Sequence, residues 1–211
     1  MSGISSALGV ISKFIDIGKE IAKLPALFLP QYQSSATDLY EICQKLLKAN
    51  ENLSRWLHRF RYLDLSDRNA TSLAFQEYRS MKTGPEFQQM KFSCFDISSI
   101  YYRNISLKIG MWFSNQQKIE EAEGIFNRLT DADEDMVAFV FDIVIGRLDE
   151  FVDEVENEFD VGNLDRAEEL RLEFKSETKE IAQQLEKFSG DLSDLTISFA
   201  KIARVPITLG V

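Results

Sequence analysis

The single histidine of this 211-residue chain limits the chemistry it could carry out. Any reaction that requires an imidazole must use His58, which lies among Arg55, Arg59 and Arg61 on a predicted helix. The sequence has no phosphate-binding glycine loop, no G-x-S-x-G nucleophile motif, and no H-E-x-x-H or E-x-x-H metal motif. We therefore predict a surface or partly packed His58, and we assign neither a catalytic residue nor a cofactor.

One acidic run is similar to the start of a calcium-binding loop. Asp131, Asp133 and Asp135 have the alternating spacing of the first three ligands. Position six would then be Met136, where such loops have glycine, and position twelve would be Asp142, which is shorter than the usual bidentate Glu. These acids suit the positive N-terminal end of a helix better. We therefore expect no metal site.

Residues 131–160 form the most acidic part of the chain and also its most apolar part, with 12 acidic residues and one base, Arg147. Within it, Asp142 is the only polar residue of the ten from Met136 to Ile145. A carboxylate in a buried helix is costly unless it is paired. We therefore predict that Asp142 is a buried polar residue in a salt bridge, for instance with an arginine of the second helix. A carboxylate that works as a catalyst in a bundle pocket is the alternative.

The end of the same segment carries a dense set of carboxylates. Like charges at this density repel one another, and a basic partner or a basic surface of a second subunit would relieve the repulsion. The predicted partner-binding residues are Asp149, Glu150, Asp153, Glu154 and Glu156. A plain solvated face is the alternative.

The region 41–82 has the opposite charge balance, with eight bases and five acids. Its run from Arg55 to Tyr62 alternates bases with aromatic residues, a pattern that nucleic-acid-binding surfaces also have. The whole chain has a net charge of −10, which repels phosphate, so nucleic acid is not an expected partner. We favour internal pairing of this region with the acidic helix; phosphate or an acidic partner remain alternatives.

The hydrophobic period is helical nearly throughout. The predicted helices cover residues 4–24, 35–60, 67–82, 86–115, 116–128, 130–159, 164–188 and 191–204. A strand is the alternative over 136–145, where Val, Phe and Ile alternate. We expect an all-α, predominantly antiparallel bundle of five to seven helices, four of them long. Residues 1–205 would form a single domain, followed by an apolar C-terminal tail, 206–211.

The first helix has a wide apolar arc opposite a lysine-bearing face. Such a helix packs in a bundle or lies in a membrane interface. In the second case residues 1–30 would be a detachable amphipathic segment. The candidate membrane-contact residues are Ile4, Leu8, Ile11, Phe14 and Ile15. No run reaches the roughly 20 apolar residues that span a bilayer, and no charged region of a secretory signal begins the chain. We expect a cytoplasmic protein, with peripheral membrane association as an alternative.

Residues 1–60 resemble the N-terminal helical bundles of fungal HeLo and HeLo-like cell-death domains. The likeness lies in Ile4-Ser-Ser-Ala-Leu-Gly-Val-Ile-Ser-Lys-Phe-Ile15, followed after a break by a long helix that ends Leu53-Ser-Arg-Trp-Leu57. The bundle of the mixed-lineage-kinase-like necroptosis effector is more distantly similar. This resemblance implies a first helix that a partner domain can release into membranes. It consists of apolar pattern and transfers no residue roles.

Taken together, these patterns indicate a non-enzymatic protein-interaction or regulatory module that presents an acidic helix face. Its expected partner is a basic protein surface, which a second copy of the chain could supply. The alternative is a membrane-active effector, of the cell-death or pore-forming type, whose N-terminal helix inserts into or lies on a bilayer.

Overall fold

The computed structural model describes residues 2–24, 29–85, 87–88, 97, 100–101, 105–130 and 136–206. For residues 2–7, 31, 129–130 and 136–141 it describes the backbone alone. The elements are α1 (Ser2–Ile21), the short 3-10 helix η2 (Pro30–Tyr32), α2 (Gln33–Arg61), α3 (Arg68–Thr83), α5 (Ile109–Trp112), α6 (Gln116–Thr130), α7 (Met136–Asp160), α8 (Leu164–Glu177) and α9 (Lys179–Ala203).

The prediction of an all-α fold is confirmed. The described ranges contain eight α-helices and no strand, so the alternative of a strand over 136–145 is wrong. The count slightly exceeds the expected five to seven, in part because the single turn α5 (Ile109–Trp112) is a helix of its own. About half of the predicted helix 86–115 lies outside the described residues, and the part that is described is interrupted by a turn at 106–108.

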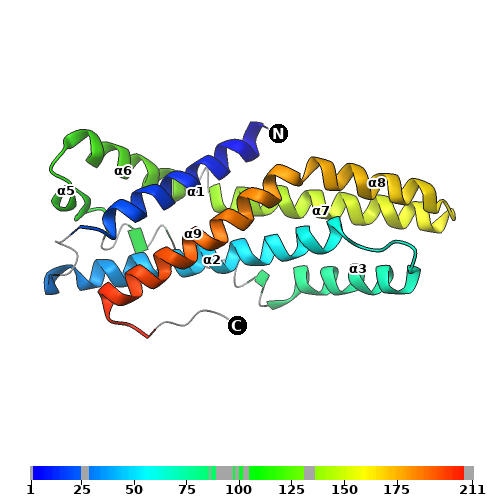
Figure 1. Cartoon of the computed structure of the whole chain (residues 1–211), viewed down its shortest axis with the longest axis horizontal. Coiled ribbons are helices and arrows are strands. Elements are labelled where there is room, and N and C mark those ends of the chain that lie inside the picture. Colours follow the sequence, from blue (N-terminus) through cyan, green and yellow to red (C-terminus); the bar gives the residue numbers. More distant parts are fainter. Residues whose placement is uncertain are drawn as a thin grey trace.

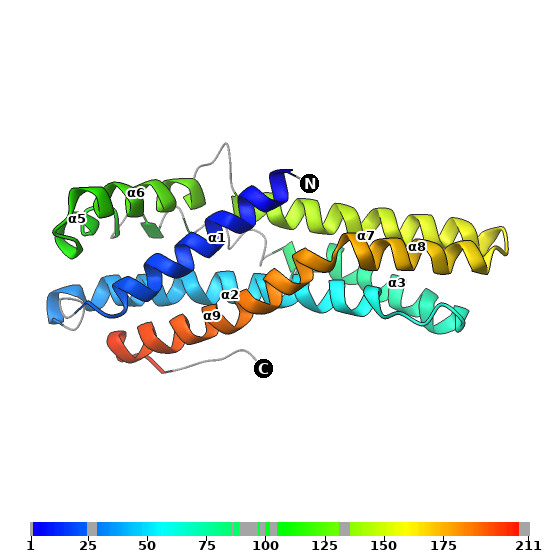
Figure 2. The same cartoon turned by 45° about the horizontal axis from the view of Figure 1, so that its top comes forward.

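The long helices α2 and α9 run side by side along the molecule (Figures 1 and 2). Their order is antiparallel: Asn50 Nδ2 donates to Leu185 O at 2.6 Å, and Tyr40 Oη, nearer the start of α2, donates at 3.4 Å to Pro206 O, just beyond the end of α9. The apolar residues that recur every three or four positions along α2 are all buried: Leu39, Ile42, Leu46, Ala49, Leu53, Trp56 and Phe60. The period of this helix in the sequence therefore identified its packed face correctly.

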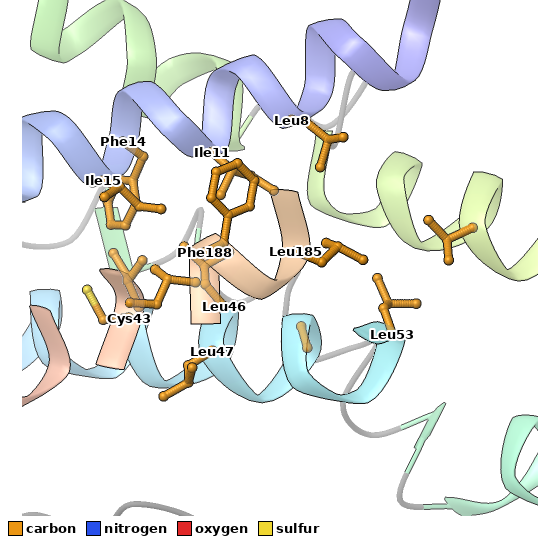
Figure 3. Close-up of a cluster of buried hydrophobic side chains, with 14 of the residues drawn as sticks. Leu8, Ile11, Phe14, Ile15, Cys43, Leu46, Leu47, Leu53, Leu185 and Phe188 are labelled. Atoms are coloured by element: carbon orange, nitrogen blue, oxygen red, sulfur yellow. The ribbon is translucent and has the colours of Figure 1, made fainter. Parts of the chain in front are cut away.

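Helix α1 crosses this pair and closes one side of the core (Figure 3). Leu8, Ile11 and Phe14 point from it toward α2 and α9. At Gly18, α1 and α9 approach so closely that a Cβ on this glycine would lie 3.0 Å from Leu195 Cδ1. The amphipathic pattern of the first helix therefore serves packing in this conformation.

At the other end of the molecule, α7 and α8 form a hairpin that α3 flanks (Figure 1). Its turn uses Gly162 at φ +77, and Asn163 Oδ1 then caps α8 by accepting from Arg166 N at 3.3 Å. A left-handed φ is easily adopted only by glycine, so the stop predicted at Gly162-Asn163 has a clear physical basis. The hairpin is held by stacking of Phe151 on Phe174, with ring centroids 4.4 Å apart.

The boundary between the last two helices differs from the prediction. The sequence indicated one helix over 164–188 and a break before 191, but the break lies at Thr178 and α9 continues through Gly190. Thr178 Oγ1 donates to Phe174 O at 2.7 Å, a bond from a hydroxyl to the preceding turn that often bends helices. This break changes which side chains of α8 and α9 face α2.

Candidate functional site

The acidic face of α7 lies against α3, and much of its charge is neutralised there. Arg79 contacts Glu156 at 2.6 Å and Asp153 at 3.2 Å, and Arg68 lies 3.9 Å from Asp160. All three carboxylates lie on one face of α7, at spacings of three and four residues. Internal pairing of the basic 41–82 region with the acidic helix is therefore confirmed for the bases of α3.

Asp149 has the most complete set of partners on this face. Lys82 Nζ lies 2.8 Å from each of its carboxylate oxygens, and Tyr78 Oη donates to Oδ1 at 3.0 Å. Burial raises the pKa of Tyr78, and the neighbouring carboxylate of Asp149 raises it further. The phenol therefore stays protonated and acts as a donor that ties α3 to α7.

Of the five predicted partner-binding residues, Asp149, Asp153 and Glu156 thus contact α3. We call this set of contacts along α3 the seam; the other two residues lie outside it. Glu150 lies 2.9 Å from Arg147 on its own helix, and Glu154 is exposed. The acidic face of α7 is therefore not wholly solvated: one side of it pairs with α3, and the other side faces solvent.

The prediction that Asp142 is buried is wrong. The structure places its side chain at an exposed position, two residues before the buried Val144. The apolar run around it indicated burial on every side, but α7 lies at the edge of the bundle here and one of its faces meets solvent. The alternative of a catalytic Asp142 in a bundle pocket depended on the burial of this side chain, and the exposed position removes that basis.

The described members of the membrane-contact set lie in the core. Leu8, Ile11, Phe14 and Ile15 are all buried, and the side chain of Ile4 is outside the described residues. Within the described ranges no helix combines the length and hydropathy needed to cross a bilayer. The acids at 131–135, which imitated a calcium loop, also lie outside the described residues.

Side chains suited to nucleophilic or metal chemistry are scattered. Cys43 is fully buried on α2, and burial raises the pKa of its thiol. His58 is exposed, as predicted, and its ring contacts that of Tyr62 at a tilt of 39°, with ring centroids 4.8 Å apart. Among the described residues no group of three or more His, Cys, Asp or Glu side chains could hold a metal ion.

A groove of about 1070 Å³ lies where α2 faces the junction of α8 and α9. Its α2 wall carries residues one or two turns apart on the helix surface: Glu51, Ser54, Arg55, His58, Arg61 and Tyr62. The opposite wall includes Leu172, Lys175 and Ser176 from α8 and Lys179, Gln183 and Glu186 from α9. We call this feature the α2/α9 groove.

The charges of the α2/α9 groove are unbalanced in a direction opposite to that of the whole chain. Arg55, Arg61, Lys175 and Lys179 line it together with two carboxylates, Glu51 and Glu186. In the described structure none of the four cations forms an ion pair, whereas the bases of α3 are neutralised by α7. A protein with a net charge of −10 thus has a groove whose lining side chains carry four positive and two negative charges.

Tyr62 organises the cationic end of the groove. Lys175 Nζ lies 4.3 Å from the centroid of its ring and Arg61 Cζ lies 5.7 Å from it. Cation–π contacts of this kind contribute about 0.5–1 kcal/mol at exposed sites. The ring is itself 54% exposed, so it can also contact a ligand.

One hydrogen-bond donor of the Arg61 guanidinium has no partner. Its Nε is buried without a hydrogen-bond partner, although a buried donor left unpaired costs about 1–3 kcal/mol. The neighbouring Arg171 differs, because it donates to Arg61 O at 3.0 Å and pairs with Glu168. This pairing lowers the pKa of Glu168, chiefly through the hydrogen bond from Arg171. Arg171, beside the groove, therefore has its partners within the protein, whereas Nε of Arg61, inside the groove, does not.

The sequence located one wall of this groove and missed the other. The run from Arg55 to Tyr62 was singled out for its bases and aromatics, but Lys175 and Lys179 had no distinguishing pattern within a mixed-charge helix. Their spacing of four residues was the available signal. It became meaningful only with the break at Thr178 and the antiparallel order of α2 and α9.

The fold and groove define the chain as an all-α bundle with a cationic surface groove. Comparison of the chain with protein-family models, with curated proteins and with solved structures finds no match in any of the three. The resemblance of residues 1–60 to HeLo domains is therefore neither supported nor refuted by these comparisons.

Proposed function

We propose that this chain is a non-enzymatic interaction module. The observation that carries the proposal is the α2/α9 groove, whose four cations have no ion-pair partner in the described part of a strongly acidic chain. Like charges that outnumber the counter-charges near them do not help the fold, since their mutual repulsion opposes it. A charged binding partner is the ligand that would neutralise them.

The side chains available in the groove support binding better than catalysis. In the groove, His58 contacts the ring of Tyr62; Cys43 lies outside the groove, buried in the core, where burial raises the pKa of its thiol and disfavours the reactive thiolate. The solvent side of α7, with Glu150 and Glu154, offers a second charged surface of the opposite sign. We retain it as the proposed site for a basic partner in a cytoplasmic setting.

Cross-linking in the native host, followed by purification of the full chain, tests the module. Three chains are compared: the natural one, a groove-neutral variant (Arg55→Gln, Lys175→Gln, Lys179→Gln) and a control variant (Lys13→Gln, Lys187→Gln, Lys201→Gln). The control makes the same charge change at exposed lysines outside the groove. A Glu150→Gln, Glu154→Gln chain examines the acidic side in parallel.

The proposal expects specific cross-linked proteins to disappear with the groove-neutral or acidic-side variant and to persist with the control. An identical set of cross-linked proteins for all four chains would overturn it. Circular dichroism of each chain ensures that a loss does not reflect unfolding.

Membrane insertion of α1 is the alternative function, and the packing of α1 opposes it energetically. Fully burying a side chain such as Leu, Ile or Phe contributes about 1.5–3 kcal/mol. Releasing Leu8, Ile11, Phe14 and Ile15 would therefore cost roughly 6–12 kcal/mol before any membrane contact compensates. This is comparable to the whole stability of a typical domain, about 5–15 kcal/mol, so release would require a trigger.

Liposome co-sedimentation of the full chain separates this alternative from the module. Binding of the unaltered chain to vesicles, abolished by a Leu8→Gln, Ile11→Gln substitution that leaves it folded, would favour membrane activity. The module proposal expects no sedimentation of either chain.

A further inference from the structure

We infer that the α2/α9 groove binds an acidic segment of a partner protein, with the ligand's carboxylates along the row of cations that leads to the Tyr62 end. The inference rests on the proposed function and specifies the ligand of one of its surfaces. The net charge of the groove lining is positive. Arg55, Arg61, Lys175 and Lys179 outnumber Glu51 and Glu186, so the complementary ligand is an anion.

The groove is polarised along its length. Asn50 contacts Leu185 and Ser189, while the carbonyl of Arg61 accepts from Arg171, so these contacts fix the two ends. Both carboxylates lie toward the Asn50 end, and Arg61 and Lys175 lie toward the Tyr62 end. A ligand therefore gains most when its negative charges gather at the Tyr62 end.

The cations are spread along the groove and do not converge on one point. On α2 they are separated by the turns between Arg55 and Arg61, and on the other wall Lys175 and Lys179 are one turn apart. From Glu51 to Tyr62 the α2 wall extends about 16 Å at 1.5 Å per residue. A single inorganic anion can contact only part of this row, whereas a peptide segment with several carboxylates can follow it.

The remainder of the lining favours a peptide over a nucleic acid or a membrane. Ser54, Ser176 and Gln183 supply hydroxyl and amide groups that can serve main-chain donors and acceptors. Glu51 and Glu186 would repel a continuous phosphate backbone, and the net charge of −10 would repel any extended anionic surface. A short segment avoids this repulsion because it needs complementarity only inside the groove.

Tyr62 is a positioning residue for the cationic end. It holds Lys175 over its ring at 4.3 Å and lies beside His58 and Arg61. Removing the ring should weaken binding without a change of charge. Tyr62→Leu therefore separates correct placement of the cations from their mere presence.

The test uses a synthetic helical peptide of about 12 residues, long enough to match the α2 wall at 1.5 Å per residue. It carries four Glu at spacings of three and four, blocked ends and a fluorophore; a second peptide has Gln in place of Glu. Fluorescence anisotropy measures binding to the natural chain, the groove-neutral variant and the control variant. Sodium phosphate, and vesicles of phosphatidylserine and phosphatidylcholine, are added as competitors.

We expect the Glu peptide to bind the natural chain at least about tenfold more tightly than the Gln peptide, with an affinity that falls as salt rises. The groove-neutral variant should lose at least about tenfold and Tyr62→Leu about threefold, whereas the control variant should change less than about twofold. Phosphate at millimolar concentration should compete weakly, and the vesicles should not compete.

Three results would overturn the inference: equal binding of the two peptides, equal losses in the groove-neutral and control variants, or binding of the vesicles in preference to the Glu peptide. Should native proteins still cross-link through the groove while the Glu peptide fails, the acidic-segment inference falls and the interaction module stands. If neither cross-linking through the groove nor binding of the Glu peptide is found, the groove has no part in the proposed function.

Discussion

The two sides of α2 use positive charge in contrasting ways. Toward α3 and α7 the bases belong to a seam in which Arg59 lies 2.5 Å from Glu77, Arg79 meets Glu156, and Lys82 meets Asp149. Toward α8 and α9, Arg55 and Lys179 line a groove without ion pairs in the described structure. The first arrangement joins helices, and the second leaves charge for a ligand.

This contrast teaches that the amount of basic charge does not predict its use. Surface ion pairs contribute only about 0–1 kcal/mol each, so neither side is held mainly by electrostatics. The seam also has an aromatic core, with Trp56, Phe60 and Tyr78 in edge-to-face contact. The groove lacks such a core, and its Tyr62 is more than half exposed.

The largest expected effect comes from the aromatic core behind the seam. Phe60 is fully buried and contacts the rings of Phe75 and Phe151 as well as Trp56. Phe60→Ala should lower the free energy of unfolding by about 3–5 kcal/mol, because it removes buried apolar area and leaves a cavity. Urea denaturation followed by circular dichroism measures the loss. A loss below about 1 kcal/mol would mean that the seam lacks the rigid core described here.

A smaller loss is expected at the best-connected ion pair of the seam. Asp149→Ala removes the acceptor of both Lys82 and Tyr78 and should cost about 1–3 kcal/mol. Glu154→Ala, on the solvent side of the same helix, should stay within about 0.5 kcal/mol. Equal effects of the two substitutions in thermal unfolding would break the distinction between the paired and solvent sides of α7.

The exposed part of the seam should contribute less and depend on salt. Arg79→Ala removes the contacts to Glu156 and Asp153 and should cost about 0.5–1 kcal/mol at low ionic strength. Because these side chains are partly exposed, the cost should shrink in 1 M salt. Chemical denaturation with urea at two salt concentrations checks both expectations. A cost that does not change with salt would point to packing by the arginine stem instead.

The smallest effect on stability is expected in the groove. The groove-neutral variant should unfold within about 0.5 kcal/mol of the natural chain, since it removes repulsion while losing one cation–π contact at Tyr62. The control variant should behave alike in the same thermal-unfolding measurement. A loss above about 2 kcal/mol in the groove-neutral variant alone would show that these cations hold the fold, and the contrast between seam and groove would disappear.

Local patterns in the sequence predicted most of the helices. The boundaries of α3 and of the turn at Gly162 follow from capping residues, Asp67 and Asn163, whose side chains accept from the first turns of their helices. Thr178 was missed because a threonine inside a helical pattern has no strong breaking signal. Asp142 was misplaced because an apolar run does not show which of its sides a neighbouring helix will cover.

The candidate site was predictable only in part, for a related reason. Arg55 and Tyr62 belong to a recognisable run, and the acids of α7 were expected to meet bases of the 41–82 region. Which bases would meet them was decided by the position of α3 beside α7, which brings Arg79 to Glu156 and Lys82 to Asp149. Lys175 and Lys179 joined the groove because α8 and α9 return along α2 more than 100 residues later in the chain.

The sequence by itself determined the helical class, the buried face of α2 and the segregation of acidic and basic charge, because these depend on spacing within a few turns of one helix. Only the tertiary structure decided which charges are neutralised and which are left in the α2/α9 groove. Ion pairing depends on distances of a few ångströms between side chains of different helices, and those distances exist only once the helices have packed.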